Sequence, residues 1–180
     1  EHAIAWALSQ SPRCDQLYVA PGNGGTASIA QNVKNLAVEE GDAVLSFAKD
    51  HEIGLVVVGP EAPLVAGVAD VVRAAGIPIF GPDAQGAQLE GSKTYSKEFM
   101  DANGIPTARY ASFTDEAQAR AYCEELGAPL VVKADGLAAG KGVIVAETLE
   151  VALDAVKECF QGAFGEAGNR VVIELSLIHI

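Results

Sequence analysis

Apolar runs of strand length alternate with helical patterns in the first half of the chain. The expected strands are Leu17–Ala20, Ile53–Val58 and Ile77–Phe80. The expected helices cover residues 2–9, 43–51 and 64–75. Asp42 precedes the second helix and is a suitable N-cap, because its carboxylate can accept hydrogen bonds from the first turn. The continuous apolar run at 53–58 is typical of a parallel strand that is covered on both faces.

A turn rich in glycine or proline follows each of these strands. The turns are residues 21–27, 59–63 and 81–83. Strands joined by helices, with such turns after them, predict a doubly wound α/β unit with a parallel sheet. Ligands of these sheets bind outside the carboxyl ends of the strands, so we expect the three turns to converge on a binding site.

The pattern changes near residue 90, after which the strand–helix–strand rhythm is lost. A helix is expected from Lys93 to about residue 103, with Ser92 as its N-cap. Its expected apolar side is Tyr95, Phe99 and Met100. The later elements are a strand at 109–113, a helix from its cap Thr114 to about residue 126, strands at 130–133 and 143–146, a helix capped by Thr148, a loop at 162–169 and a strand at 171–174. This order predicts a helical subdomain at 90–126 followed by a small α+β layer at 127–174.

Residues 130–143 read LVVKADGLAAGKGV, in which a strand ends on Lys133, a glycine-rich turn carries Lys141, and a second strand follows. Glycines let the backbone approach a ligand closely, and their N–H groups suit phosphate oxygens. The segment is not a P-loop, because three residues rather than four separate Gly136 from Gly140 and no helix follows. It predicts a flap over phosphates. The alternative is an ordinary hairpin whose lysines lie in solvent.

The net charge of −12 disfavours nucleic acid or an anionic membrane as a partner, since both require basic surface. An acidic chain that binds a phosphorylated ligand must concentrate its cations locally. The candidates are Lys93, Lys133 and Lys141. Cys14, Cys123 and Cys159 are widely spaced, which argues against a disulfide framework or zinc site and fits a cytoplasmic protein. We interpret the last two as core residues. The histidines share no metal-ligand spacing, and no apolar run approaches the roughly 20 residues of a membrane span.

Seven segments are informative because of their order. They are EHA at 1–3, PGNGGTA at 21–27, VGPEAPLVAG at 58–67, FGP at 80–82, QLEGSK at 88–93, GIPTA at 104–108 and KADGLAAGKGV at 133–143. In this order they resemble the glycinamide ribonucleotide synthetases, the phosphoribosylamine–glycine ligase family of purine biosynthesis. The second region is similar to the front of an ATP-grasp fold. The resemblance implies an N-terminal pre-ATP-grasp α/β domain at 1–89 and the start of an ATP-grasp α+β domain at 90–174.

The resemblance also implies an ATP-dependent ligase. The family joins glycine to 5-phospho-β-D-ribosylamine and forms glycinamide ribonucleotide, ADP and phosphate through a glycyl phosphate. Phosphorylation gives the glycine carboxylate a leaving group, so the protein mainly positions reactants and neutralises charge. ATP is then a substrate, and Mg²⁺ or Mn²⁺ is the cofactor. Glycine and phosphoribosylamine are the small-molecule partners, and a cytoplasmic monomer is expected for the parent protein.

Carried over residue by residue, the resemblance assigns phosphate contacts to Lys93 and Lys133. The residues expected to bind ATP are Lys93, Lys133, Asp135, Gly136, Gly140, Lys141, Gly142 and Glu174, the last at the hinge that holds adenine and ribose. The residues expected to bind phosphoribosylamine are Gly24, Gly25 and Thr26, through their N–H groups, together with Glu61 and Pro63. The alternative for the loops at 21–27 and 59–63 is ordinary turn chemistry. No catalytic or metal-binding residue is assigned.

The chain departs from the family pattern at both ends. The family has a strand and a glycine-rich turn before its Glu-His-Ala segment, which here stands at Glu1. After Glu174 the family continues with an acidic, an aromatic and an aliphatic residue. Residues 175–180 instead read LSLIHI, the translation of a sequencing adapter, so we expect this tail to be non-native. The family's metal-binding and glycine-binding residues lie downstream, and we therefore expect the chain alone not to catalyse the ligation.

Three alternatives stand beside this interpretation. Another ATP-grasp carboxylate–amine ligase or a carboxylase subunit would share the lysines and the flap but not the loops at 21–27 and 59–67. A non-catalytic nucleotide-binding remnant is a second class, which titration with ATP in the presence and absence of magnesium would distinguish. A nicotinamide-dependent oxidoreductase is disfavoured, because no G-x-G-x-x-G segment follows an expected strand.

Overall fold

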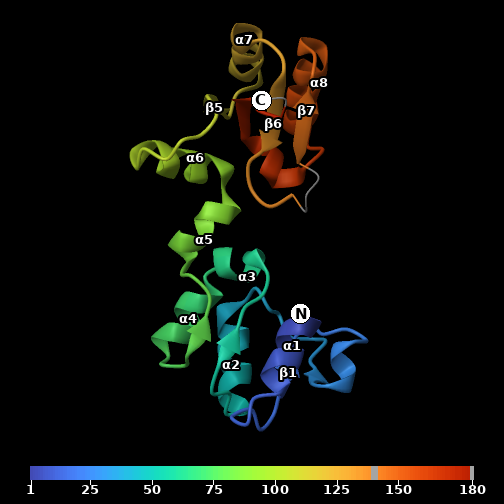
Figure 1. The fold of residues 1–180 in the computed structure, drawn as a ribbon, viewed down its shortest axis with the longest axis vertical. Coiled ribbons are helices and arrows are strands. Elements are labelled where there is room, and N and C mark those ends of the chain that lie inside the picture. The colour runs from blue at the N-terminus through green and yellow to red at the C-terminus, as the bar shows by residue number, and fades with distance from the viewer. Residues whose placement is uncertain (139–141, 179–180) are drawn as a thin grey trace. The chain divides into compact units, whose positions relative to one another are not determined.

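The computed structural model describes residues 1–138 and 142–178. The chain forms two compact units, Glu1–Ala87 and Gln88–Ile180 (Figure 1). The domain boundary expected at residues 89 and 90 lies inside helix α5 (Ala84–Gly91), so the chain passes from one unit to the next through a helix.

The N-terminal unit is an α/β structure, as its alternating pattern predicts. Its elements are α1 (His2–Ser9), β1 (Tyr18–Val19), η1 (Thr26–Ser28), β2 (Gln31–Asn32), α2 (Gly41–Asp50), β3 (Val56–Val57), α3 (Glu61–Val65), α4 (Val68–Ala74) and β4 (Ile79–Phe80). β1 pairs with β2, and β3 pairs with β4, in both cases in parallel. Helices α3 and α4 form the crossover between β3 and β4 that parallel pairing requires. The predicted α/β class with parallel strands is therefore confirmed.

Three local predictions for this unit were wrong. Residues 31–32, expected in a polar connection, form β2, because Gln31 N donates to Leu17 O across the parallel pair. The helix expected over 64–75 is divided at Gly67, whose φ of +85° lies in the left-handed region that favours glycine. Asp42 lies in the first turn of α2, and the N-cap of that helix is Glu40.

The strands of this unit are shorter than the apolar runs that predicted them. In the run at 53–58 the paired residues are Val56 and Val57, and Leu55 is 50% exposed, so the run is not covered on both faces. Phe80 at the end of β4 is 71% exposed. Among the described residues, each strand has a hydrogen-bonded neighbour on one side, which limits the length of the ladder.

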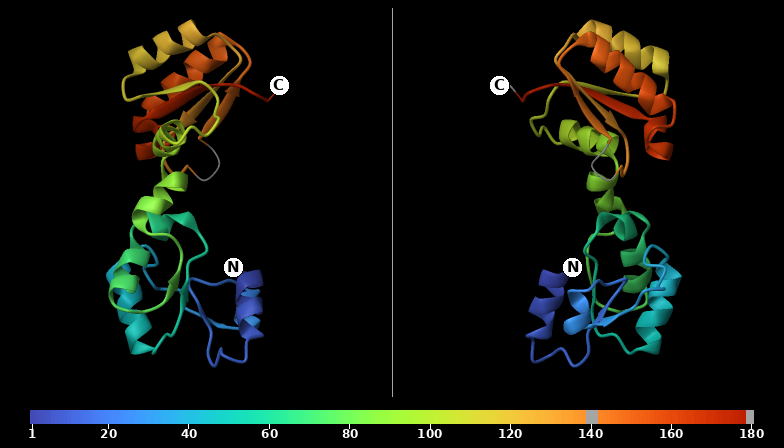
Figure 2. Two further views of the ribbon diagram at one scale, coloured as in Figure 1. Left: turned by 60° about the vertical axis from the view of Figure 1, so that its left-hand side comes forward. Right: turned by 90° about the vertical axis from the view of Figure 1, so that its right-hand side faces the viewer.

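The C-terminal unit is an α+β layer, as expected. Its elements after α5 are α6 (Lys93–Ala102), β5 (Tyr110–Phe113), α7 (Glu116–Leu126), β6 (Leu130–Ala134), β7 (Val143–Ala146), α8 (Leu149–Phe160), η2 (Gly165–Asn169) and β8 (Val171–Leu175). The four strands form one antiparallel sheet in the order β5–β8–β6–β7. Helices α7 and α8 pack side by side against one face of this sheet (Figure 2). The predicted strand–flap–strand is the β6–β7 hairpin.

Two of the three N-caps predicted in this unit are confirmed. The hydroxyl oxygens of Ser92 and Thr148 accept hydrogen bonds from the first turns of α6 and α8. Thr114 does not cap α7. Asp115 takes that position, with Oδ1 accepting from Gln118 N at 2.9 Å, because the helix begins one residue later and a carboxylate is a good cap acceptor. The segment expected as a loop at 162–169 contains the short 3₁₀ helix η2.

Alternate residues of the central strands form the core beneath α7 and α8. The strands contribute Leu130, Val132, Ala134, Val171 and Ile173, and the helices contribute Ala119, Cys123, Ala152, Val156 and Cys159. The expectation that Cys123 and Cys159 are core residues is confirmed. Burial raises the pKa of each thiol to about 11, so neither is a reactive thiolate near neutral pH.

We expect Ile173→Ala to lower the free energy of unfolding of the C-terminal unit by about 3 kcal/mol. Ile173 is fully buried at the centre of the core, and its truncation removes apolar contacts and leaves a cavity. Val151→Ala is the matched control, because Val151 is 44% exposed on α8, and it should cost less than about 0.5 kcal/mol. Urea unfolding followed by circular dichroism measures both. Equal midpoints for the two variants would contradict the core assignment.

Candidate functional site

The face of the sheet opposite α7 and α8 carries charged residues from two neighbouring strands. Lys133 in β6 and Glu174 in β8 alternate with core residues, so their side chains leave the sheet on this second face. Helix α6 is attached to the same face, where Thr94 Oγ1 lies 3.1 Å from Ser112 Oγ of β5. The face therefore brings together side chains from α6, β6 and β8.

Glu174 lies between two lysines on this face. Its Oε1 forms an ion pair with Lys133 Nζ, and its Oε2 forms one with Lys97 Nζ. Burial by itself would raise the pKa of Glu174, but the hydrogen bonds and charges of Lys133 and Lys97 lower that pKa below its ordinary value. Glu174 is therefore ionised at neutral pH. The two lysines exceed its charge and leave the cluster net positive.

Lys93 begins α6 and reaches the first residues of the flap. Its Nζ donates to Gly136 O at 2.8 Å. Burial lowers the pKa of Lys93 more than the Asp135 carboxylate raises it, and the charge of Lys133 lowers it further. Lys93 therefore contacts the flap directly, while Lys133, the other residue expected to contact phosphate, pairs with Glu174.

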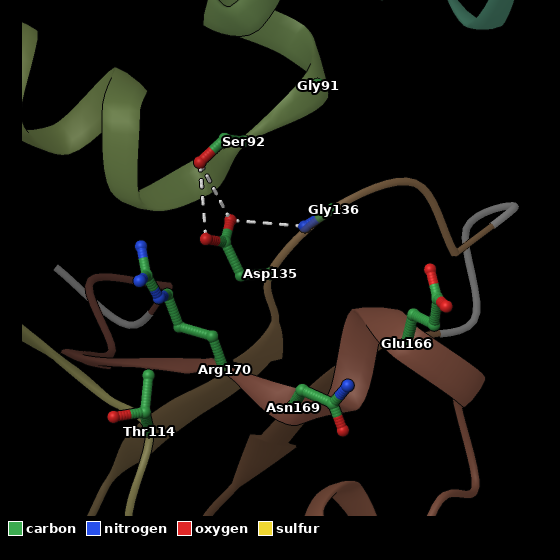
Figure 3. Close-up of a pocket in the computed structure, with 8 residues that line it drawn as sticks. All are labelled: Gly91, Ser92, Thr114, Asp135, Gly136, Glu166, Asn169 and Arg170. Atoms are coloured by element: carbon green, nitrogen blue, oxygen red, sulfur yellow. Dashed lines mark hydrogen bonds between the residues drawn. The ribbon is translucent and has the colours of Figure 1, made fainter.

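Asp135 joins the N-terminus of α6 to the start of the flap (Figure 3). Its Oδ1 accepts from the backbone N–H groups of Lys93 at 2.5 Å, Thr94 at 3.2 Å and Gly136 at 3.1 Å. The Ser92 hydroxyl lies 3.3 Å from Oδ1 and 3.2 Å from Oδ2. Both carboxylate oxygens of Asp135 are thus already hydrogen-bonded within the protein. The carboxylate expected among the ATP contacts thus holds the flap against the helix.

The described part of the flap closes on its own base. Ala134 N donates to Gly142 O at 2.8 Å. A Cβ on Gly142 would lie 2.8 Å from Ala138 Cβ, so this position requires glycine. Gly136 has a φ of +97°, which also favours glycine. Gly140 and Lys141, both expected to contact ATP, lie outside the described residues.

An open depression of about 290 Å³ adjoins the junction of α6 and the flap (Figure 3). It is lined by Gly91, Ser92, Thr114, Asp135, Gly136, Glu166, Asn169 and Arg170. Two residues of the expected ATP site, Asp135 and Gly136, belong to this lining, whereas Lys93, Lys133 and Glu174 do not. The depression therefore adjoins the face of the sheet that carries Lys133 and Glu174 without including these residues.

The loop at 21–27 is organised by the side chain of Asn23. Asn23 Oδ1 accepts from Gly25 N at 2.9 Å and from Thr26 N at 3.2 Å. The buried Thr26 hydroxyl accepts from Asn23 N at 2.8 Å and lies 2.7 Å from Asn32 Oδ1. Two of the three N–H groups expected to receive a phosphate are thus bonded to an amide oxygen, which a phosphate would have to replace. Gly24, the third, is exposed.

Glu61 and Pro63 lie in the first turn of α3, where proline is compatible with a helix. Glu61 is exposed and Pro63 is buried. Within the described residues, no hydrogen bond or ion pair links either residue to the loop at 21–27. Their shared role in binding phosphoribosylamine stays a prediction.

The sequence pattern did not single out Lys97, the second lysine that pairs with Glu174. The apolar side expected around Phe99 lies partly in solvent, since Phe99 is 41% exposed, and α6 instead buries Thr94 and Lys97. These two residues are three positions apart and share a helix face. That spacing was the available signal, but a lysine in a helix is ordinarily solvated, and nothing in the sequence placed Glu174 beside it.

The described residues offer no evident magnesium site. Within 1–138 and 142–178, no group of three or more His, Cys, Asp or Glu side chains could hold a metal ion. Asp135 and Glu174, the carboxylates of the lysine-bearing face and its junction with the flap, are engaged by protein donors. In the same part of the chain, no helix has the length and apolar character needed to cross a bilayer.

Comparison with known families accounts for both units. Residues 1–90 match the family described as phosphoribosylglycinamide synthetase, N domain. Residues 91–178 match phosphoribosylglycinamide synthetase, ATP-grasp (A) domain. The second match includes four residues of the tail that was expected to be non-native, which is why its origin stays a prediction.

Curated relatives resemble the chain over nearly its whole length. The chain is 58% identical to the phosphoribosylamine–glycine ligase of Vibrio cholerae serotype O1 over 177 residues, covering 97% of the chain and 41% of the relative. It is also 58% identical to that of Rhizobium meliloti, covering 98% of the chain and 42% of the relative. The chain thus spans about two fifths of the length of these relatives.

Solved structures give the same picture of the fold. A phosphoribosylamine–glycine ligase from Thermotoga maritima superposes with a TM-score of 0.76 at 29% identity, covering 98% of the chain and 41% of that protein. The biotin carboxylase domain of a 2-oxoglutarate carboxylase from Hydrogenobacter thermophilus, whose structure contains MgADP, superposes with a TM-score of 0.74 at 18% identity and covers 98% of the chain and 42% of that domain. At 18% identity, the second likeness concerns the fold alone.

Proposed function

The chain belongs to the phosphoribosylglycinamide synthetase family, and we propose that it forms the N-terminal part of an ATP-dependent phosphoribosylamine–glycine ligase. The observation that carries the proposal is the order of its parts. A parallel α/β unit that matches the N domain precedes a unit in which Lys93 contacts the start of a glycine-rich flap and Lys133 pairs with Glu174. Matches to both domains in this order favour this ligase over other ATP-grasp proteins.

The proposed reaction joins glycine to 5-phospho-β-D-ribosylamine in two steps. A carboxylate oxygen of glycine attacks the γ-phosphorus of ATP, the bond to the β,γ-bridging oxygen breaks, and ADP leaves. The amine then attacks the carbonyl carbon of glycyl phosphate and loses a proton, and phosphate leaves as the amide forms. Both steps require anionic groups to be held together, so positioning and charge neutralisation are the main contributions of the protein.

The lysine-bearing face supplies the cations for this task. In the proposal Lys93 and Lys133 contact the ATP phosphates together with the described flap residues Asp135, Gly136 and Gly142. Glu174 lies where adenine and ribose are held. The loop at 21–27 and Glu61 receive phosphoribosylamine. The positive excess of the Glu174 cluster and the partial burial of Lys93 support the first of these assignments.

Magnesium, when bound, would neutralise charge on the β- and γ-phosphates. We place the ligands of Mg²⁺ or Mn²⁺ downstream of Glu174, where the family pattern has its metal-binding residues. The MgADP of the biotin carboxylase neighbour is consistent with a metal–nucleotide complex in this fold. A cytoplasmic, monomeric parent protein is also part of the proposal.

The test is ADP formation by the protein expressed from the complete reading frame. With ATP, Mg²⁺, glycine and phosphoribosylamine made from ribose 5-phosphate and ammonia, ADP should accumulate only when glycine and the amine are both present. The 180-residue chain alone should form none. ADP formation that depends on bicarbonate and not on glycine would identify a carboxylase subunit. Nucleotide binding without turnover by the complete protein would identify a binding remnant.

A further inference from the structure

Lys97 is a buried lysine without a role in the phosphate contacts proposed above. Its Nζ forms an ion pair with Glu174 Oε2, donates to Thr107 Oγ1 at 2.5 Å and lies 5.2 Å from the centre of the Tyr110 ring. Lys133 pairs with the other oxygen of the same carboxylate. The side chain of Lys133 is 25% exposed, compared with 10% for Lys97. One carboxylate is therefore shared by a lysine held on several sides and a more accessible one.

Contact between Lys133 and a phosphate has a consequence for Glu174. The Lys133 ammonium must leave Glu174 Oε1, at least in part, to approach another anion. A buried carboxylate that loses its partner is strongly destabilised. Lys97 can remain in place during this exchange, because Thr107 and Tyr110 hold its ammonium from other directions.

We propose that Lys97 is a positioning residue that keeps Glu174 an ionised, fixed carboxylate while Lys133 transfers from Glu174 to a nucleotide phosphate. This inference rests on the proposed nucleotide-binding role of Lys133. It assigns the two lysines different tasks: Lys133 binds the ligand, and Lys97 compensates the charge that Lys133 leaves behind.

The groups that face Glu174 support this division. They are Lys97 from α6, Lys133 from β6 and Tyr110, which lies opposite Glu174 in the β5–β8 register. Burial, together with the hydrogen bond to Asp101, raises the pKa of Tyr110 to about 12, so its hydroxyl is neutral in the physiological range. Tyr110 therefore cannot take over the charge of Lys97.

The experiment is calorimetric titration of the complete protein with the Mg²⁺ complex of a non-hydrolysable ATP analogue. Titrations in two buffers of different ionisation enthalpy report the protons taken up on binding. Wild type and Lys97→Arg should bind with the same proton balance, because Glu174 keeps a cation in both. Lys97→Met should take up an additional fraction of a proton. In that variant nucleotide binding leaves Glu174 buried without a cation, and this raises its pKa.

The pH dependence of Lys97→Met follows from the same change. Because the pKa of Glu174 rises on binding, protons favour the bound state, and the affinity defect should be largest at high pH. We expect binding about 10- to 100-fold weaker than wild type near pH 8, with a defect that shrinks towards pH 5.5. Lys157→Met, at an exposed position on α8, is the matched control and should bind as wild type does.

The outcomes separate this inference from the proposed function. No binding by wild type would refute both. Equal binding by wild type and Lys97→Met, without proton uptake, would leave the function standing and overturn the inference. A pH-independent loss shared by Lys97→Arg would indicate packing and would also overturn it. If Lys97→Met does not fold, Glu174→Gln is compared with Lys97→Met/Glu174→Gln. The two should bind alike, and a large difference between them would refute the role of Lys97.

Discussion

Lys133→Met is expected to lower kcat/KM for ATP in the complete ligase by on the order of 10²- to 10³-fold. Of the two lysines that pair with Glu174, Lys133 has the more exposed side chain, so its ammonium is the cation best placed to contact a phosphate. Methionine keeps much of the side-chain volume but removes the charge, so transition-state stabilisation is lost while packing is retained. Glu174 keeps its ion pair with Lys97, which should preserve the fold. Initial rates of ADP formation at varied ATP concentrations measure the effect.

The control for this experiment is Lys157→Met, which removes a lysine from the exposed surface of α8. It should leave kcat/KM for ATP within about twofold of wild type, since a distant exposed charge is largely screened. Thermal unfolding of both variants checks that each is folded. If Lys133→Met were as active as Lys157→Met, Lys133 would not be a phosphate contact, and the nucleotide site would have to lie elsewhere.

Asp135→Ala is expected to lower the free energy of unfolding of the C-terminal unit by about 3 kcal/mol. The carboxylate accepts from three backbone N–H groups and from the Ser92 hydroxyl, and all of these donors are partly buried. Ser92 remains as the N-cap of α6, but each buried donor left without a partner costs about 1 to 3 kcal/mol. Water would satisfy some of these donors, which keeps the total below the simple sum. Urea unfolding followed by circular dichroism gives the value.

Asp115→Ala provides the matched comparison within the same unit. Asp115 is the N-cap of α7 and accepts a single hydrogen bond from Gln118 N on an exposed surface, so its loss should cost about 1 kcal/mol. Hydrogen exchange adds a local measurement, because Asp135→Ala should speed exchange at Lys93, Thr94 and Gly136 while Asp115→Ala should not. Equal destabilisation by the two substitutions would show that the hydrogen bonds of Asp135 contribute no more than one exposed cap bond, and that Asp135 does not join the flap to α6.

Elements set by local physics could be predicted from the chain alone. The alternation of apolar and polar residues predicted the α/β character of the first unit and the strand–flap–strand of the second. Ser92 and Thr148 were predicted as caps because a hydroxyl before a helical pattern satisfies N–H groups only a few residues away. The motif order also led to the family, since each motif is a short run of neighbouring residues.

Features that depend on distant partners were missed or altered. β2 exists because Gln31 meets Leu17 across a parallel pair, and two-residue strands carry almost no pattern of their own. Two local hydrogen bonds were missed as well: the Asn23 amide oxygen accepts from the N–H groups of Gly25 and Thr26, two and three residues further along the same loop. The link between Asp135 and α6 was not predicted, because the N–H groups of α6 lie more than 40 residues earlier in the chain, and the contact of Asp135 with ATP stays a prediction.

The amino-acid sequence by itself determined the α/β and α+β character of the two units, the burial of Cys123 and Cys159 and the glycine-rich flap, because these follow from neighbouring residues and from helix or strand periodicity. Only the tertiary structure showed that Lys97 and Lys133 pair with the same carboxylate, that of Glu174. Sheet register brings β6 against β8 and α6 onto their free face, so that two ammonium groups meet one carboxylate. The sign and strength of such an interaction depend on distance and burial, and neither quantity is encoded in local spacing.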